Sequence, residues 1–164
     1  LRRPETSNFI FKNLKNLIQN SGDEMLLISV SMFLGSILTN SSEIQNFVNS
    51  NLGDHFPFWM MIILLPLIVW CFSLIGIHPI ITSAPILSIF GPLISVWEAA
   101  FLMQAHLIGW CAGTAISFTS LSVLTSAENF KISISKLVFG PNFFATIGLI
   151  FFGALFLILS NYLL

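Results

Sequence analysis

The sequence predicts an all-α integral membrane protein with about four or five transmembrane helices and a re-entrant or broken-helix region. Hydrophobic residues make up 55% of the 164 residues and charged residues only 8%, whereas a soluble domain carries about 25% charged residues. Six basic and seven acidic side chains cannot cover the surface of such a chain with groups that water tolerates. We therefore expect most of that surface to face the lipid bilayer.

The first 22 residues differ from the rest of the chain. Over 1–22, apolar side chains recur at helical spacing between polar ones, which is typical of an amphipathic helix on the cytoplasmic membrane surface. Ser21 and Glu24 then form the capping-box pattern that starts a helix. A membrane domain is predicted over 23–164.

Three apolar runs predict transmembrane spans over 23–39, 56–77 and 141–163, with a broken region over 78–126. The first run has about 17 residues, which is near the lower limit for a spanning helix. Pro66 falls inside the second run, where neighbouring helices can satisfy the carbonyl that it leaves without a partner.

The broken region contains a helix that is too short to span. Between Pro79 and Pro92 there is room for about 12 residues, or roughly 18 Å of helix, against a hydrocarbon core of roughly 30 Å. Ser95 and Glu98 form a second capping box, which opens a longer helix that ends at about Ser117.

The distribution of basic residues predicts the orientation. The loop over 39–56 has no Lys or Arg, whereas the other two polar segments carry all six, at Arg2, Arg3, Lys12, Lys15, Lys131 and Lys136. Because basic loops stay inside, we expect a cytoplasmic N-terminus and an outside C-terminus in a bacterial inner membrane. The loops before and after this part of the chain then lie on opposite sides of the membrane, and the span over 56–77 already crosses it once. The broken region must therefore cross the membrane either not at all or twice.

The first interruption is the segment over 76–85, which contains His78. Pro79 and Pro85 both disfavour helix in the residue before them. Thr82 or Ser83 would cap a half-helix that begins at Pro85, whose positive N-terminal end would attract an anion, with His78 adjusting the local charge. The alternative is a kinked span with a structural proline and a hydrogen-bonded histidine.

The second interruption is the segment over 113–122. It is rich in hydroxyl groups, at Thr114, Ser117, Thr119, Ser120 and Ser122. With backbone carbonyls around Gly113, these groups could hold Na⁺ or solvate a polar solute. The alternative is that the hydroxyl groups bond back to their own helix. Two interruptions in one chain favour a site, because discontinuous helices that meet near the midplane form the sites of many transporters.

Other polar or small residues have structural explanations. Ala105, Gly109, Gly113 and Ser117 recur every fourth residue and predict a face on which another helix packs closely. Glu98 belongs to a capping box, and a lone histidine such as His106 is usually hydrogen-bonded. The sequence has no Ser-His-Asp, HExxH, GxGxxG or phosphate-loop pattern. We expect no enzyme activity, no cofactor except Na⁺ as a coupling ion, and no nucleic-acid partner.

The order of these features resembles a known family. The amphipathic helix, two spans, Gly-Ile-His-Pro at 76–79, a glycine-rich helix with hydroxyl groups and a final span are similar to the second half of ion-transporter-superfamily carriers, which transport dicarboxylates, citrate, gluconate and related anions. The resemblance implies a re-entrant hairpin and a broken helix in each of two inverted halves. The family's Ser-Asn-Thr hairpin tip is absent, and 82–84 and 117–119 stand in the corresponding places.

The resulting hypothesis is half of a secondary active transporter that carries a small anionic solute by symport with Na⁺ or H⁺. The predicted solute-binding residues are His78, Thr82, Ser83 and Ser117, and the predicted ion-binding residues are Gly113, Thr114 and Thr119. The partner is a missing N-terminal half or a second copy. The alternatives are a non-catalytic helical subunit of a larger membrane complex and, with less support, an intramembrane enzyme that uses His78 or His106 with Glu98.

Overall fold

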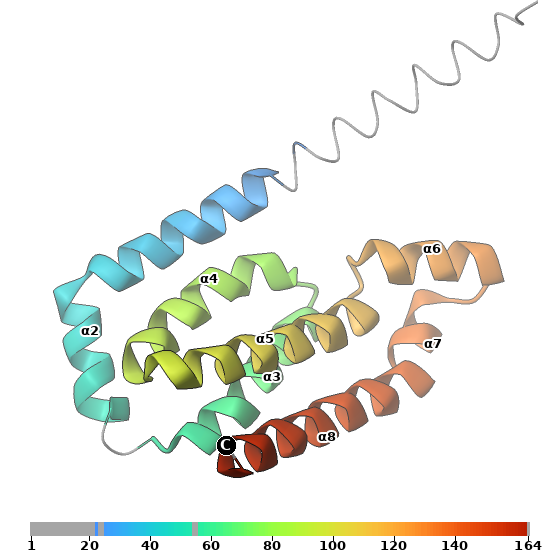
Figure 1. Ribbon diagram of the computed structural model, residues 1–164. Coiled ribbons are helices and arrows are strands. Elements are labelled where there is room, and N and C mark those ends of the chain that lie inside the picture. Colours follow the sequence, from blue (N-terminus) through green and yellow to red (C-terminus); the bar gives the residue numbers. More distant parts are fainter. Residues whose placement is uncertain (1–21, 23–24, 54–55, 164) are drawn as a thin grey trace, which may run out of the picture.

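The computed structural model describes residues 22, 25–53 and 56–163, and every regular element within them is a helix (Figure 1). The predicted helix over 1–22 and the Ser21–Glu24 capping pair lie outside these described residues, apart from residue 22. The elements are a first helix over Met25–Asn40, then α2 (Ser42–Val48), the π-helix Asn49–Gly53, α3 (Phe58–Leu74), α4 (Pro79–Phe90), the 3₁₀ turn Gly91–Leu93, α5 (Val96–Ile116), α6 (Leu121–Phe130), α7 (Ile134–Val138) and α8 (Pro141–Leu163).

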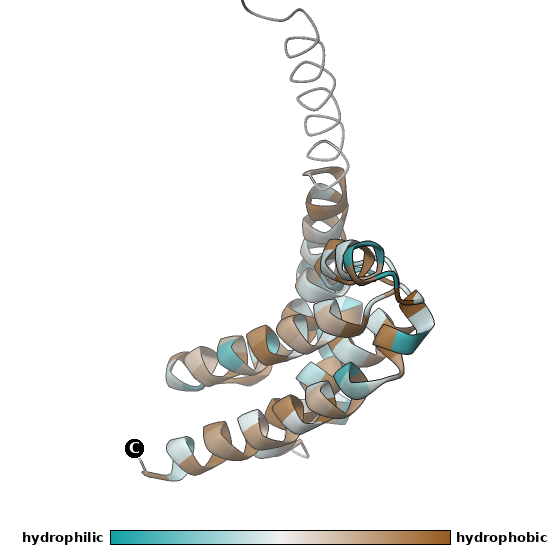
Figure 2. Ribbon diagram, turned by 90° about the vertical axis from the view of Figure 1, so that its right-hand side faces the viewer, coloured by the Kyte–Doolittle hydropathy of each residue, from teal (hydrophilic) through white to brown (hydrophobic). Residues whose placement is uncertain are grey.

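Two helical stretches of the described chain are long and apolar enough to cross a membrane, Val96–Phe130 and Ile134–Leu163. A third is available if the helices over Met25–Asn40 and Ser42–Leu52, which meet at a 75° bend, form one span. Hydrophobic residues dominate the long helices (Figure 2). The structure agrees with the all-helical prediction and with a membrane location, and by length and composition it supplies two or three candidate spans where the sequence predicted four or five.

Most predicted helix ends agree with the observed ones. The Ser95–Glu98 capping box makes both of its hydrogen bonds, so α5 starts at Val96. The last helix, Pro141–Leu163, matches the predicted span. The span predicted over 56–77 is shorter, because α3 stops at Leu74 and has 17 residues.

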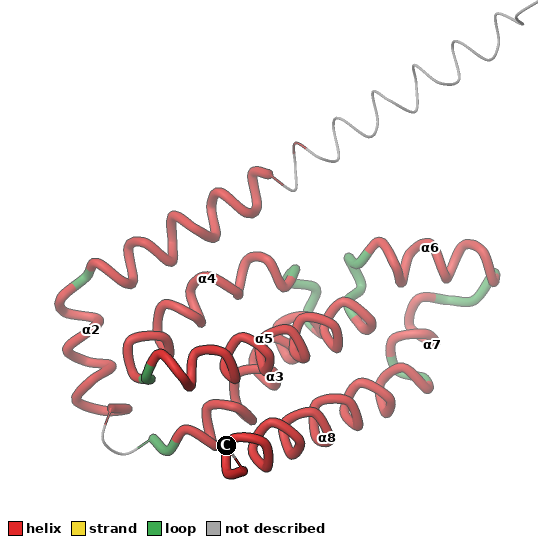
Figure 3. The backbone as a smooth tube through the Cα atoms, in the orientation of Figure 1, coloured by secondary structure: helices red, strands yellow, loops and turns green. Residues whose placement is uncertain are grey.

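The long helices run back and forth between two ends of the molecule (Figure 1). The chain reverses after α3 into α4, reverses again into α5, and returns along α8. The predicted interruptions are loops only in part: the chain is non-helical over 75–78 after α3 and over 117–120 after α5, at the same end of these two helices (Figure 3), and the remaining residues of both segments are helical. The helix α5 is central, with its main contacts to α3 and α8. A short α4 therefore returns beside α3. The sequence predicted that the Pro79–Pro92 piece is too short to span and left open whether it turns back or continues across.

The small-residue face of α5 packs directly on α3. A Cβ atom added at Gly109 would lie 2.6 Å from the Cα of Pro66, and one added at Gly113 would clash with the hydroxyl of Ser73. Ala105, on the same face, is completely buried. The prediction of a packing face is confirmed, and the two glycines set how closely α5 approaches α3.

The proline inside α4 leaves a backbone carbonyl without its usual partner, and another helix supplies a donor. Pro85 has no N–H, so the carbonyl of Ile81 loses its partner within the helix. Ser31 of the first helix is 2% exposed, and its hydroxyl donates to the carbonyls of Ile80 at 2.5 Å and Ile81 at 3.3 Å. This bond fastens the first helix to α4 where the proline weakens it.

Substitution of Gly109 by Ala should destabilise the protein by about 1–3 kcal/mol, because the new methyl group meets the backbone at Pro66. The matched control is Gly148→Ala in α8, where nothing lies within 4 Å of the added Cβ, so better helix propensity should leave stability equal or higher. Thermal unfolding in detergent measures both variants. Equal effects of the two substitutions would contradict the close approach.

Substitution of Ser31 by Ala should destabilise the protein by about 1 kcal/mol, because it removes the hydrogen bonds from this hydroxyl to the Ile80 and Ile81 carbonyls of α4. Ser29→Ala is the control, since the Ser29 hydroxyl is exposed and bonds only to Met25 of its own helix. The same unfolding measurement applies. A Ser31→Ala protein as stable as the Ser29→Ala protein would show that the bond to α4 contributes nothing.

Candidate functional site

The two interruptions lie against each other and share a hydrogen bond. The Thr119 hydroxyl in the second interruption donates to the carbonyl of Gly76 in the first, at 3.2 Å. The Thr119 hydroxyl also lies 3.0 Å from the Ser117 hydroxyl. Ser117 is 0% exposed. We call Gly76, Ser117 and Thr119 the junction. The structure thereby places next to each other two segments that are 43 residues apart in the chain.

The first interruption is formed by a helix stop followed at once by a helix start. Gly76 has a φ of 87°, which a glycine adopts without steric cost. The Gly76 N–H donates to the Ser73 carbonyl at 3.1 Å, and the Ile77 N–H to the Phe72 carbonyl at 3.0 Å, which is the Schellman pattern. Pro79 then opens α4 at the position where a missing N–H costs nothing.

His78 is the N-cap of α4. Its Nδ1 accepts a hydrogen bond from the Ile80 N–H at 3.2 Å, and its carbonyl accepts from the Ile81 N–H at 2.9 Å. These bonds satisfy two of the backbone donors that a helix start leaves without partners. The imidazole therefore occupies the place at which an anion would meet the first N–H groups of α4.

The prediction that Thr82 or Ser83 caps a half-helix beginning at Pro85 is wrong. The helix already starts at Pro79, and both hydroxyls donate back to the Pro79 carbonyl, at 3.0 and 2.6 Å. The reason is that His78 supplies the cap, so the helix starts six residues earlier than expected, and that the bonds from Ser31 to the Ile80 and Ile81 carbonyls support the helix through Pro85.

The predicted ion-binding residues are not all together. The Thr114 hydroxyl bonds back to the carbonyl of Cys111 at 3.0 Å, and Gly113 lies in the α5–α3 contact. Only Thr119 joins Ser117 at the junction. The alternative of hydroxyl groups that bond to their own helix therefore holds for Thr114, whereas Ser117 and Thr119 bond within and across the interruptions. At the first interruption, the alternative of a structural proline and a hydrogen-bonded histidine agrees with the structure.

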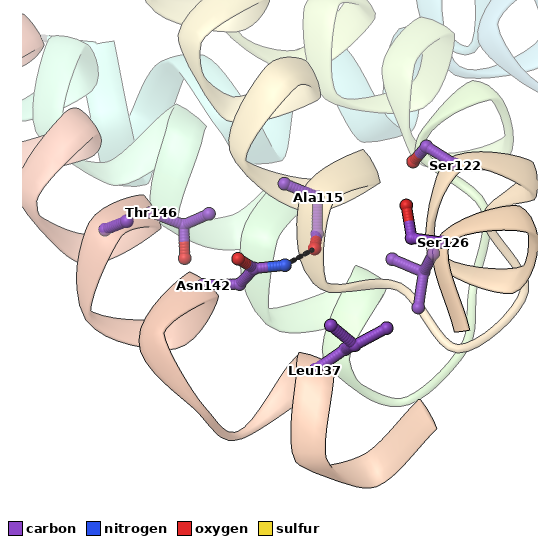
Figure 4. Close-up of a pocket in the computed structure, with 8 residues that line it drawn as sticks. Ala115, Ser122, Ser126, Leu137, Asn142 and Thr146 are labelled. Carbon is purple, nitrogen blue, oxygen red and sulfur yellow. Dashed lines mark hydrogen bonds between the residues drawn. The ribbon is translucent and has the colours of Figure 1, made fainter. Parts of the chain in front are cut away.

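The end of α5 carries side-chain bonds that sequence analysis did not predict. The Ser122 hydroxyl of α6 donates to the Thr114 carbonyl at 3.3 Å, and the Asn142 amide of α8 donates to the Ala115 carbonyl at 3.4 Å. Ala115, Ser122 and Asn142 line an open cavity of about 260 Å³ (Figure 4). The only local signal was that Asn142 is polar and stands next to Pro141 at the start of an apolar run.

A buried histidine lies near the first interruption. The ring of Trp110 is 6.3 Å from that of His78 and 5.9 Å from that of His106, edge-on to both. His106 is 4% exposed, and its Nδ1 has no hydrogen-bond partner among the described residues. Buried polar atoms without partners are rare in folded proteins.

Opposite ends of two helix dipoles are neighbours at this site. A Cβ added at Gly113, in the last turn of α5, would lie 3.4 Å from Pro79 Cγ, in the first turn of α4. The negative C-terminal end of α5 therefore adjoins the positive N-terminal end of α4. In the described residues no three His, Cys, Asp or Glu side chains gather as a metal site.

Comparison with known proteins identifies no relative: no family model, no curated protein and no solved structure matches this chain. The function is therefore inferred from the site itself.

Substitution of His106 by Leu should leave the protein as stable or raise its stability by up to about 1 kcal/mol, because an unpaired buried nitrogen is removed. Thr146→Val is the contrasting control. The Thr146 hydroxyl accepts the Trp70 indole N–H at 3.0 Å, so its loss leaves a buried donor unpaired and should cost about 1–3 kcal/mol. If thermal unfolding shows His106→Leu to be as damaging as Thr146→Val, His106 is a structural residue.

Proposed function

We propose that this chain is half of a secondary active transporter, which carries a small anionic solute by symport with Na⁺ or H⁺. The observation that supports the proposal most is the junction, where two interrupted segments meet through the Thr119–Gly76 hydrogen bond. A membrane protein that breaks two helices at one place leaves backbone groups that are stable only in contact with protein or water. Transporters use such places to bind solutes and ions.

The solute's anionic group would bind at the first turn of α4. It would replace the His78 imidazole as acceptor for the Ile80 N–H, and a protonated His78 would add a positive charge beside it. Ser117 would bind the solute from the junction, and Thr82 and Ser83 would contribute after releasing the Pro79 carbonyl. The coupling cation would lie at the negative end of α5, near Gly113, Thr114 and Thr119.

The site needs a covering partner. Thr119 is exposed in the single chain, whereas a transport site must be closed from one side of the membrane at a time. The proposed cover is an N-terminal half or a second copy of the chain. The base-bearing segment around Lys131 and Lys136 would lie on the cytoplasmic side and the C-terminus outside, in a bacterial inner membrane.

Transport should depend on the Thr119 hydroxyl. Uptake of radiolabelled citrate and succinate is measured in cells that express the full chain with its covering half. We expect Thr119→Val to lower uptake at least tenfold and Thr119→Ser, which keeps the hydroxyl, to retain most of it. Thr39→Val is the control, since that hydroxyl bonds only to Gly35 of its own helix. Wild-type uptake by Thr119→Val would contradict the proposal.

A second candidate is a non-catalytic subunit of a larger membrane complex. The back-bonded hydroxyls of Thr82, Ser83 and Thr114 favour it, because they leave fewer polar groups for a solute. Single cysteines at 80–84 and 114–120, in a chain whose Cys71 and Cys111 are replaced by Ser, distinguish the two candidates. A polar thiol reagent should modify them in a transporter and leave them unmodified in a packed subunit.

A further inference from the structure

Two adjoining hollows lie along the contact between α3 and α8, away from the junction. The first has a volume of about 270 Å³ and is lined by apolar side chains, from Ile63 and Leu67 of α3 and from the stretch Ile147–Ile158 of α8. The second has a volume of about 250 Å³ and lies where the start of α3 meets the end of α8, near the C-terminus (Figure 1). Ile158 lines both hollows, and we call the two together the α3–α8 groove.

The apolar part of the groove is as long as one leaflet of a bilayer is deep. Along α8 it extends from Ile147 to Ile158, which corresponds to about 16 Å of helix at 1.5 Å per residue. Half of a hydrocarbon core of roughly 30 Å is about 15 Å. A single acyl chain that lies along α8 would therefore fill this part of the groove from the membrane surface to the midplane.

The second hollow has the composition of a membrane–water interface. Trp59, Tyr162 and the amide of Asn161 line it. Trp and Tyr concentrate at the level of the lipid head groups, because each ring is apolar but carries one polar atom. Trp59 is 43% exposed and Tyr162 is 74% exposed, so both rings are accessible to a molecule in the groove. The groove thus has the two parts of an amphiphile, an apolar length and a polar, aromatic end.

The charges at this end favour a cationic head group. No Lys or Arg lines the groove, and the segment over 39–56, which precedes α3, carries Glu43 and Asp54 and no base. The last carbonyls of α8 form the negative end of the dipole of a 23-residue helix. The faces of the Trp59 and Tyr162 rings attract an ammonium group. A zwitterionic phospholipid with an amine therefore fits this end better than an anionic phospholipid.

We propose that the α3–α8 groove binds one molecule of phosphatidylethanolamine. An acyl chain lies along α8, and the ammonium group lies at the rings of Trp59 and Tyr162. The Asn161 amide donates a hydrogen bond to the lipid phosphate. The proposal rests on the membrane location of the chain and not on transport, because no residue of the groove belongs to the junction.

Native mass spectrometry of the full chain tests the proposal. The protein is purified in detergent and mixed with phosphatidylethanolamine or with phosphatidylglycerol of the same acyl chains. We expect the parent to retain one phosphatidylethanolamine per chain and to bind this lipid about fivefold more tightly than phosphatidylglycerol, whose head group is anionic and lacks the amine.

A larger side chain in the apolar part of the groove should exclude the acyl chain. Leu155→Trp should raise the apparent Kd for phosphatidylethanolamine about tenfold or more, because the indole occupies the space of the lipid. The matched control is Leu149→Trp, since Leu149 is on the same helix and 45% exposed, against 43% for Leu155, but does not line the groove. It should bind the lipid as the parent does. Thermal unfolding verifies that both variants fold.

The aromatic end of the groove is tested separately. Trp59→Leu should raise the apparent Kd for phosphatidylethanolamine about threefold and leave that for phosphatidylglycerol unchanged, because only the amine interacts with the ring. Trp97→Leu is the control. Trp97 is 61% exposed in the first turn of α5 and does not line the groove, so its loss should affect neither lipid.

Three results would overturn the proposal: a parent that retains no phosphatidylethanolamine, equal lipid binding by Leu155→Trp and Leu149→Trp, or equal binding of the two lipids by the parent. The alternative occupant of the groove is a helix of a second polypeptide. A Leu155→Cys variant, with Cys71 and Cys111 replaced by Ser and a photoactivatable cross-linker attached, would then cross-link to that polypeptide in the membrane. Cross-linking to lipid alone would support the proposal.

Discussion

The close approach of α5 to α3 is the constraint on which the remaining structure depends. Gly109 lies on the backbone at Pro66, and Gly113 lies on Ser73 and Pro79. Larger residues at either glycine would push the helices apart by the width of a side chain. The end of α3, the start of α4 and the end of α5 would then separate, and Thr119 could not reach the Gly76 carbonyl. The small-residue face is thus a packing device that also positions the site.

Each interruption is compensated locally, which explains how an apolar chain tolerates it. The end of α3 bonds its carbonyls through Gly76 and Ile77, and His78 bonds the first N–H groups of α4. Where local residues do not suffice, a distant helix supplies the partner, as Ser31 does for Ile81. In lipid each unpaired backbone group would cost several kcal/mol. The bonds that close the breaks are therefore as much a part of the fold as its helices.

The sequence predicted what short-range patterns determine. Capping and proline chemistry within a few residues determine three of these features. They are the capping box of Ser95 and Glu98, the start of α8 at Pro141 and the existence of two interruptions. The start of α4 was misplaced, because the tolerance of Pro85 depends on a serine about 50 residues earlier. The bond from Asn142 to Ala115 joins residues 27 apart. Such pairings depend on how the helices pack, which no local pattern contains.

The central claim is that the two interruptions lie side by side, and cross-linking tests it most directly. Ile77→Cys and Thr119→Cys are combined in the full chain, with Cys71 and Cys111 replaced by Ser, and treated in the membrane with a short bifunctional thiol reagent. The control pairs Ile77→Cys with Val96→Cys, at the far end of α5, about 30 Å along that helix from Thr119. The account predicts an intramolecular cross-link for the first pair and none for the control. A first pair that stays unlinked, although each cysteine reacts singly, would contradict it.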